Sequence, residues 1–416
     1  MMKSLSIKCY KVLFLSVVCL LFSYTAQAQY NRVFSTNIRT LQVVAGERWL
    51  DLPIILLHGD EQVNIDFDDM THEYHRYVYS VEHCEADWTV SKELFTSDFL
   101  SGFAEGNTID DVEESINTNF LYTHYHFSLP NSRCQLKMSG NYRVTIYDEN
   151  EQQRPIAQVC FMVVEPLMGV QKEIKTNTDL DINGRHQQLS ATLLYSSLPV
   201  QNSKTELQTV VLQNNRWTTA VWNPTPQYVM PDGLRWEHCR ALIFNGWNEY
   251  RKFEVLDTDR TSMGLESMQW DGHHHHAFVW PAEARPSYVY DEDANGAFYI
   301  RNSDNWENQT ESDYVYVHFM LPSNYLRGEV FLNSQFTNDQ LSNTYKMEYN
   351  WDTQAYESVQ LLKLGYYSYQ YVWRTPEGEQ LPVPSEGNFY QTENIYTLLV
   401  YYRRTGDRTW RLVAAQ

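Results

Sequence analysis

The chain of 416 residues is poor in cysteine, in basic residues and in long apolar runs. Its six cysteines are too sparse for a disulfide scaffold, so a hydrophobic core must carry its stability. The 32 lysines and arginines stand against 52 acidic residues, which gives a net charge of −20. Nucleic acids and anionic lipids are bound by clustered basic residues, so this charge argues against both as partners.

The motifs of common enzyme families are also missing. The sequence has no G-x-S-x-G, no H-E-x-x-H, no phosphate-binding glycine loop and no EF-hand loop. Ser139-Gly140-Asn141 is similar to the S-x-N element of penicillin-interacting serine enzymes, but the mature chain lacks the S-x-x-K and K-T-G elements of that chemistry. The acidic pair Asp110-Asp111 indicates a solvated surface rather than a glycosidase pair. We therefore expect no enzymatic activity and no cofactor.

Two kinds of cluster could in principle bind metal. The triplets Glu82-His83-Cys84 and Glu237-His238-Cys239 each place a histidine beside a cysteine. Neighbouring residues of a strand point to opposite faces, so such a pair rarely binds one ion. The tract from His273 to His276 has no cysteine or carboxylate at ligand spacing, and its neighbours indicate an exposed loop. We expect no metal site.

The N-terminus has the three parts of a secretory signal peptide. Three lysines precede an apolar stretch from Val12 to Phe22, and Ala26-Gln27-Ala28 forms a cleavage site. The apolar stretch is too short to span a membrane, and no later segment has 18 consecutive apolar residues. Cleavage after Ala28 removes three lysines and no acid, which changes the net charge from −20 to −23. The mature protein is expected to be exported to the periplasm.

Cleavage leaves Cys84, Cys134, Cys160 and Cys239 in a compartment that permits disulfides. Four cysteines allow three complete pairings, and the sequence does not choose among these pairings and free buried thiols.

Short alternating segments predict an all-β protein. Examples are Tyr142–Tyr147, Gln158–Val164, Leu207–Gln213 and Asp313–Leu321, in a chain with 30 tyrosines, 18 phenylalanines and 12 tryptophans. Turn residues and prolines separate the segments into a string of about three immunoglobulin-like β-sandwiches. We predict a signal peptide at residues 1–28 and domains at residues 29–165, 166–261 and 262–416.

One set of motifs goes beyond composition. His83-Cys84-x-x-Asp87-Trp88 and Ser139-Gly140-Asn141-Tyr142 resemble the N-terminal domain of the type IX secretion system plug proteins of Bacteroidetes. Asn248-Glu249 and Asn295-Gly296 continue the resemblance further along the chain. These motifs are structural rather than chemical. The resemblance implies a non-enzymatic periplasmic protein that binds and seals the large outer-membrane β-barrel of the type IX translocon, with a docking surface that the motifs do not locate.

The last third of the chain suggests an alternative. Gly328 to Phe336 and Leu364 to Val372 resemble the immunoglobulin-like modules that bind starch and glycogen. This chain has no tryptophan after Phe336, where those modules would stack a sugar, and Tyr366 and Tyr367 are the other aromatic candidates. The resemblance implies a glycan-binding or surface accessory protein, with the shared fold favoured over a shared ligand.

Overall fold

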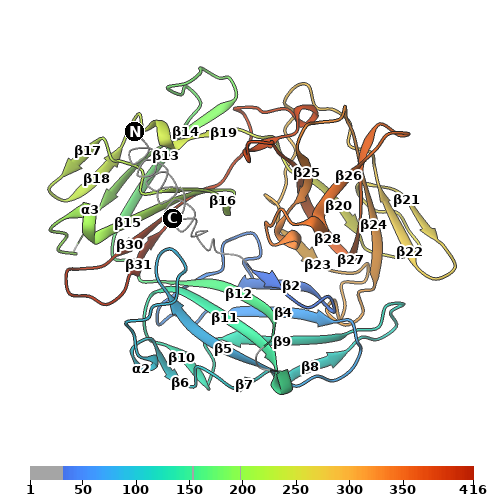
Figure 1. Ribbon diagram of the computed structural model, residues 1–416, viewed down its shortest axis with the longest axis horizontal. Helices are drawn as coiled ribbons and strands as arrows, with labels where there is room; N and C mark the ends of the chain where they lie inside the picture. Colours follow the sequence, from blue (N-terminus) through green and yellow to red (C-terminus); the bar gives the residue numbers. More distant parts are fainter. Residues whose placement is uncertain (1–30, 152–153, 197) are drawn as a thin grey trace, which may run out of the picture.

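The computed structural model describes residues 31–151, 154–196 and 198–416 and places them in three β domains (Figure 1). The predicted signal peptide lies outside these residues. None of the helices in the described part of the chain is long and apolar enough to cross a membrane. The all-β fold class is confirmed, because β-strands in several sheets build each domain and the helices, such as α2 (Thr96–Phe99) and α3 (Ser203–Glu206), are single turns.

The first domain, residues 31–165, is a sandwich of two main sheets. One sheet contains, in order, β1 (Arg32–Val33), β12 (Pro155–Val164), β11 (Gly140–Asp148), β5 (Tyr77–Cys84) and β7 (Asn107–Thr108), with β3 (Ile54–Leu56) parallel to β12. The other contains β2 (Ile38–Ala45), β4 (Val63–Asp69), β9 (Thr123–Leu129) and β8 (Asp111–Glu114). A short ribbon joins β6 (Leu100–Gly102) to β10 (Cys134–Leu136).

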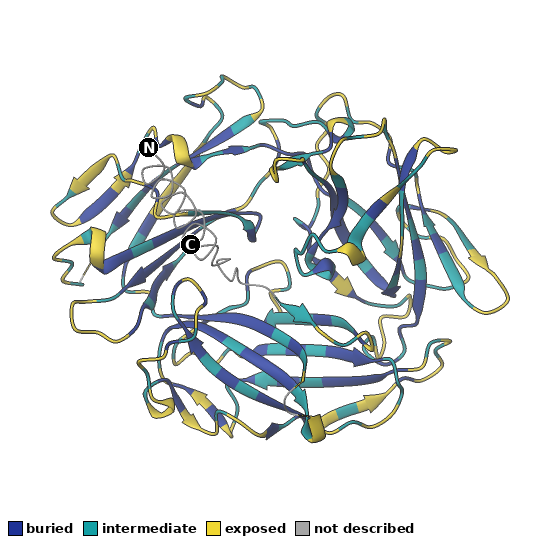
Figure 2. Ribbon diagram, in the orientation of Figure 1, coloured by how far each residue is buried: buried dark blue, intermediate teal, exposed yellow. Residues whose placement is uncertain are grey.

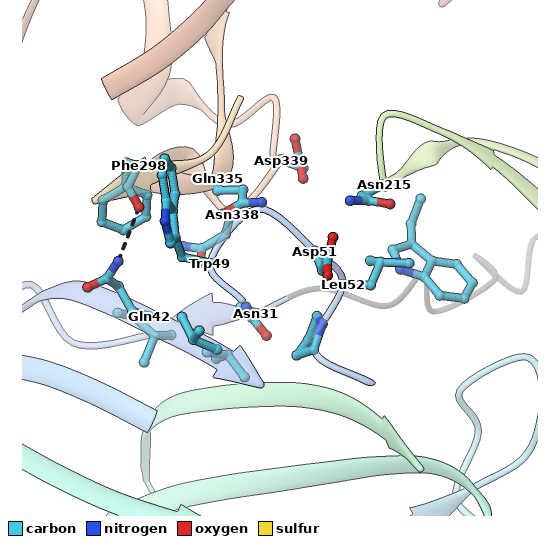
Figure 3. A pocket seen from close by; sticks show the side chains of 15 residues that line it. Asn31, Gln42, Trp49, Asp51, Leu52, Asn215, Phe298, Gln335, Asn338 and Asp339 are labelled. Carbon is cyan, nitrogen blue, oxygen red and sulfur yellow. Dashed lines mark hydrogen bonds between the residues drawn. The ribbon is translucent and has the colours of Figure 1, made fainter. Parts of the chain in front are cut away.

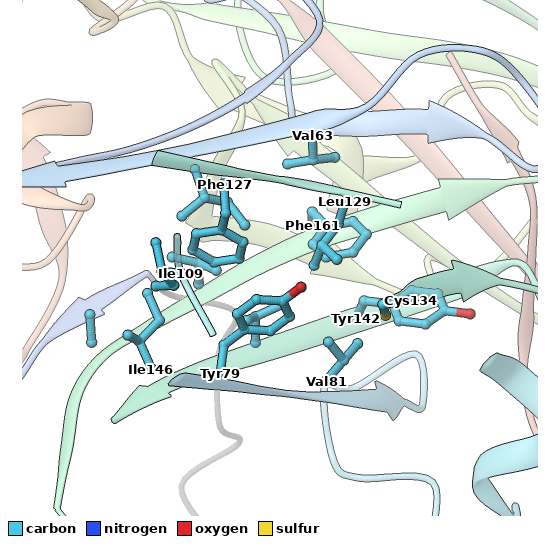
Figure 4. Close-up of a cluster of buried hydrophobic side chains, with 14 of the residues drawn as sticks. Val63, Tyr79, Val81, Ile109, Phe127, Leu129, Cys134, Tyr142, Ile146 and Phe161 are labelled. Carbon is cyan, nitrogen blue, oxygen red and sulfur yellow. The ribbon is translucent and has the colours of Figure 1, made fainter. Parts of the chain in front are cut away.

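Aromatic and branched side chains fill the space between the two sheets of the first domain (Figure 4). Tyr142 stacks on Phe161 with ring centroids 5.4 Å apart, and Tyr79 stacks on Phe127 at 4.5 Å. Alternation along each strand delivers these side chains to one face, as the sequence pattern predicts.

The middle domain consists of residues 166–245 together with the end of the chain, 396–416. One sheet contains β13 (Gly169–Lys175), β14 (His186–Leu194), β18 (Gly233–Trp236) and β17 (Tyr228–Met230), with β19 (Ile243–Asn245) beside β14. The other contains β16 (Arg216–Trp222), β15 (Leu207–Gln213), β30 (Tyr396–Tyr402) and β31 (Arg411–Ala415).

The C-terminal domain, residues 251–382, is built from one ten-stranded sheet folded over its own core. Its order is β20 (Arg251–Val255), β28 (Gly365–Arg374), β25 (Glu329–Asn333), β26 (Lys346–Asn350), β27 (Ala355–Lys363), β24 (Tyr314–Pro322), β22 (His275–Val279) and β21 (Leu265–Trp270), with β23 (Phe298–Ile300) and β29 (Gln380–Pro382) also paired to β28.

The strand pairing differs from the predicted boundaries at 166–261 and 262–416. Strand β20 belongs to the C-terminal sheet, and β30 pairs with β15 of the middle domain from Leu207↔Tyr402 to Gln213↔Tyr396. The chain therefore leaves the middle domain, builds the C-terminal domain and returns. The physical reason is that β30 supplies alternate side chains, such as Leu398 and Val400, to the middle-domain core.

The three domains lie around a common centre, and each contacts the other two (Figure 1). Buried residues run through the middle of each domain and continue onto strands that face a neighbouring domain, whereas exposed residues gather on the hairpin turns (Figure 2).

Candidate functional site: the junctions between domains

Most of the residues singled out in the first domain lie at its junction with the middle domain. His83 Nδ1 lies 2.9 Å from Ser91 Oγ, which lies 3.1 Å from Thr409 Oγ1 in the turn between β30 and β31. The other ring nitrogen of His83 lies 3.3 Å from the carbonyl oxygen of Ser139. Burial lowers the pKa of His83 to about 4, so the ring is neutral at neutral pH. His83 is thus a structural link and not an exposed acid or base.

Asn141, in the neighbouring strand β11, also contributes hydrogen bonds to this junction. Its side-chain nitrogen donates to the Glu85 carbonyl oxygen at 2.9 Å, and its Oδ1 accepts from the Tyr401 hydroxyl at 2.9 Å. The preceding Gly140 has φ +143°, and a Cβ there would lie 2.4 Å from His83 Nε2. The close approach of strand and imidazole therefore requires glycine at this position.

Tryptophans close the apolar part of this junction. Trp88 packs edge-on against Trp217 of the middle domain with centroids 5.5 Å apart, inside a cluster that also contains Cys84. Asp87 precedes it in the turn, and its carboxylate accepts from the Thr89 amide at 3.1 Å. Tyr142 points the other way, into the core of the first domain.

The second group of singled-out residues lies where the middle and C-terminal domains join. The Asn248 side chain donates to the Glu386 carbonyl oxygen at 2.7 Å, and the Glu249 carboxylate accepts from the Tyr288 hydroxyl at 2.5 Å. Asn295 and Gly296 form a turn against Tyr250, with φ +48° and +87°. The structure thus brings Asn248, Glu249, Asn295 and Gly296 together around Tyr250.

The third junction, between the first and C-terminal domains, holds residues that the sequence reasoning missed. Lys363 Nζ lies 2.6 Å from Asp68 Oδ2, and the two side chains are 0% and 1% exposed. The same carboxylate accepts from the Tyr314 hydroxyl at 2.6 Å and lies 2.8 Å from His124 Nδ1. Burial lowers the pKa of Lys363. Burial also acts to raise the pKa of Asp68, but Lys363 and His124 outweigh this effect, and the pKa of Asp68 is lowered. One signal was present in the sequence, since Lys363 stands between Leu362 and Leu364 in an apolar segment.

A pH dependence of stability follows from this junction. Burial lowers the pKa of His124, but hydrogen bonds to Asp66 and Asp68 outweigh it and raise that pKa to about 9. An unfolded histidine titrates near 6.5. The stabilisation is complete below about pH 6.5 and is lost as the pH rises through 9, amounting to about 3 kcal/mol at most. Urea unfolding at several pH values should show this decline, and His124→Gln should flatten it.

The matched control for that series is the exposed His58→Gln, which should leave the slope between pH 6.5 and 9 unchanged. An equal slope in wild type and His124→Gln would contradict the assignment.

All three domains border one small cavity of about 80 Å³ (Figure 3). Gln42 comes from the first domain and donates to the Phe298 carbonyl oxygen at 3.4 Å, and Asn215 comes from the middle domain. Asp339 of the C-terminal domain also lines it, and burial raises the pKa of this carboxyl to about 6. The cavity is a polar meeting point of the domains, without a paired nucleophile and base among its lining residues.

The candidate metal residues are not assembled. His83 packs against Phe99 and Tyr142, whereas Cys84 points to the opposite side of β5, and His238 lies in another domain beside Asp179. No group of three or more histidine, cysteine or acidic residues in the described ranges has metal-binding geometry. Cys84, Cys134 and Cys239 carry buried free thiols, and Cys160 is also buried.

The histidine tract differs from the predicted loop. His275 and His276 lie in β22, and His276 Nδ1 is 2.8 Å from His318 Nε2 on the neighbouring β24. His274 stacks on Phe120 of the first domain at 4.7 Å. The tract therefore forms part of a sheet face and of the third junction.

Comparison with known proteins agrees with this domain arrangement. Residues 38–165 match the family described as type 9 secretion system plug protein 1st domain. The chain belongs to the type IX secretion system plug protein family. A crystal structure of a hypothetical protein from Parabacteroides merdae is 38% identical, with a TM-score of 0.90, over 94% of this chain and 99% of that one. No curated protein matches.

The matched region ends at Glu165, and the likeness to the solved structure extends through the other two domains. The three-domain arrangement of this plug-family protein, with the returning β30 and β31, is therefore shared along nearly the whole of a related chain. The singled-out residues of the family motifs lie mainly at the joins between domains, where they fix how the domains sit against each other.

Proposed function

We propose that this plug-family protein is a non-enzymatic periplasmic stopper that binds and seals the outer-membrane β-barrel of the type IX translocon. The observation that carries the proposal is that each domain contacts the other two through buried or partly buried side chains: Tyr401 with Asn141, Arg216 with Gln380, and Lys363 with Asp68. A wide barrel lumen needs an obstacle that does not deform, and three mutually braced domains provide one without chemistry.

The C-terminal domain is our proposed docking surface. Interfaces are rich in exposed aromatic residues surrounded by polar ones. Trp270, Trp280, Trp306 and Trp351 are 52–71% exposed and all lie in this domain, whereas Trp222 of the middle domain is 38% exposed. The protein partner would be the translocon barrel, so the plug would be peripheral to the outer membrane through that partner.

The glycan-binding alternative has less support. Tyr367 is 1% exposed and stacks in the core of the C-terminal domain, and Tyr366 packs against Trp49 of the first domain. A sugar ring needs an exposed aromatic face, which Tyr367 does not offer. The similarity to starch- and glycogen-binding modules is better explained by a shared fold than by a shared ligand.

Deleting the gene should open a path and should not stop secretion. Cells without the protein should take up large hydrophilic antibiotics faster while they still export type IX cargo, and the wild-type gene should restore the barrier. The purified protein should co-isolate with a much larger barrel. Moderate salt should weaken this association little, because buried aromatics rather than exposed charges would hold it.

Alanine variants test the docking surface. Combined Trp270→Ala, Trp280→Ala and Trp351→Ala should reduce co-isolation, whereas Trp222→Ala should not. Unchanged outer-membrane permeability in the deletion strain, together with no barrel in the pull-down, would refute the proposal.

A further inference from the structure

A pocket of about 350 Å³ lies between the first and C-terminal domains, next to the cavity of Figure 3. Leu41, Phe298 and Asn338 line both spaces. The volume is in the range of small-molecule sites, which run from about 300 to 1,000 Å³ and favour places where domains meet. Its walls come from β2 with the segment before it, and from the short turns that follow β25.

The charge of this pocket is opposite to that of the whole chain. None of its 20 lining residues is an aspartate or glutamate, although the chain has 52 acidic and 32 basic residues. Its one charged lining residue is Arg39, which is half-buried. Within residues 31–151, 154–196 and 198–416, the Arg39 guanidinium has no ion pair or side-chain hydrogen bond. A cation half-removed from water without a counterion calls for an anion.

The remaining lining suits a ligand with an apolar body. Phe298, Phe336 and Tyr345 contribute aromatic surface, and Ser342 and Thr344 also line the pocket. Burial raises the pKa of Tyr345, and the nearby charge of Arg39 opposes that rise. The Arg39 guanidinium is therefore close enough to Tyr345 for its charge to affect that ring, on the side of the pocket that has both polar and aromatic residues.

The backbone beside Arg39 is also unusual. The pairing of β2 with β4 shifts register between Arg39 and Gln42, which forms a bulge, and Thr40 within it has φ +48°. A β-branched residue seldom adopts positive φ. Thr40 Oγ1 lies 2.5 Å from the Tyr314 hydroxyl, so the third junction holds the bulge in place. Bulges re-aim side chains, and strained backbone gathers at ligand sites.

We propose that this pocket binds a small organic anion, with its carboxylate or phosphate on the Arg39 guanidinium and its apolar body against Phe336 and Tyr345. Arginine can hold either group through two parallel N–H bonds. Such a ligand would touch the first and C-terminal domains together and would stabilise their junction. The inference concerns a ligand site and does not depend on the stopper function.

Calorimetric titration of the full mature chain with phenylacetate, phenyl phosphate, inorganic phosphate and benzyl alcohol tests the proposal. One of the two aromatic anions should bind with a dissociation constant below about 1 mM, and whichever binds more tightly identifies the anionic group. Benzyl alcohol and inorganic phosphate should bind at least tenfold more weakly, because each lacks one half of the ligand.

The variants locate the site. Arg39→Ala should weaken the bound anion at least tenfold and Arg39→Lys by less, while Arg327→Ala, an exposed arginine outside the pocket, should have no effect. Thr36→Ala, at a lining residue that the proposed pose does not use, should retain binding, which checks that the pocket tolerates substitution. If Arg39→Ala unfolds the chain, Thr344→Val should still weaken the anion. Failure of both aromatic anions to bind the wild type, or equal binding by Arg39→Ala, would overturn the proposal.

Discussion

Replacing Lys363 by methionine should lower the free energy of unfolding by about 3–5 kcal/mol. The variant removes the cation and leaves the Asp68 carboxylate, 1% exposed, in the same place. The Tyr314 hydroxyl still donates to Asp68, and at pH 6 the His124 imidazolium still lies 2.8 Å from Asp68 Oδ1. His124 is shared with Asp66, however, so it compensates the Asp68 charge only in part once Lys363 is gone. Urea unfolding at pH 6, followed by far-ultraviolet circular dichroism, measures the loss.

The matched control is Arg48→Met. Arg48 and Glu61 also approach to 2.6 Å, but their side chains are 44% and 34% exposed, so water screens the pair. Exposed pairs contribute about 0–1 kcal/mol, and the control should lose no more than that. The double variant Asp68→Leu with Lys363→Met should recover much of the loss, because no charge is then left unpaired. Equal losses for Lys363→Met and Arg48→Met would contradict the role given to burial.

Much of the fold could be predicted because alternation is a local signal. The pattern of Leu207–Gln213 predicts a strand, and this segment is β15 with the same bounds. Tyr142–Tyr147 likewise lies within β11. The family motifs were also readable locally, and they identified residues that fix domain orientation. Side-chain pattern within a few residues determines strand formation, so one sequence suffices for this part.

Pairing between distant segments could not be predicted in the same way. Asp68 and Lys363 are 295 positions apart, and the local sequence around each residue does not indicate that the other is its partner. For the same reason the sequence did not predict that β30 pairs with the middle domain, although one feature of the sequence pointed to an unusually buried strand. Leu398 to Tyr402 is a continuous apolar run, which is typical of a strand buried on both faces. Leu398 and Val400 face the middle-domain core, whereas Leu399 and Tyr401 face the first domain.

Removing residues 396–416 should therefore unfold the middle domain, although this segment follows the whole C-terminal domain in sequence. The truncation takes away β30 and β31, half of one middle-domain sheet, and exposes β15 along seven residue pairs. It also removes Tyr401, Trp410 and Leu412 from the junction with the first domain. The free energy lost with this much buried apolar surface is larger than the net stability of a typical domain, which is about 5–15 kcal/mol.

Hydrogen exchange measured by mass spectrometry on the truncated and full-length chains resolves the effect by domain. Amides of β14 and β15 should lose their protection in the truncated chain, while those of β24 and β27, whose sheet is complete without the last 21 residues, should keep most of theirs. The matched control is Tyr401→Phe, which removes only the hydroxyl that donates to Asn141 and should cost about 0.5–1.5 kcal/mol. If β14 and β15 stayed protected after truncation, the middle domain would be complete at residue 245, and the returning strands would be an attachment to a sandwich that folds without them.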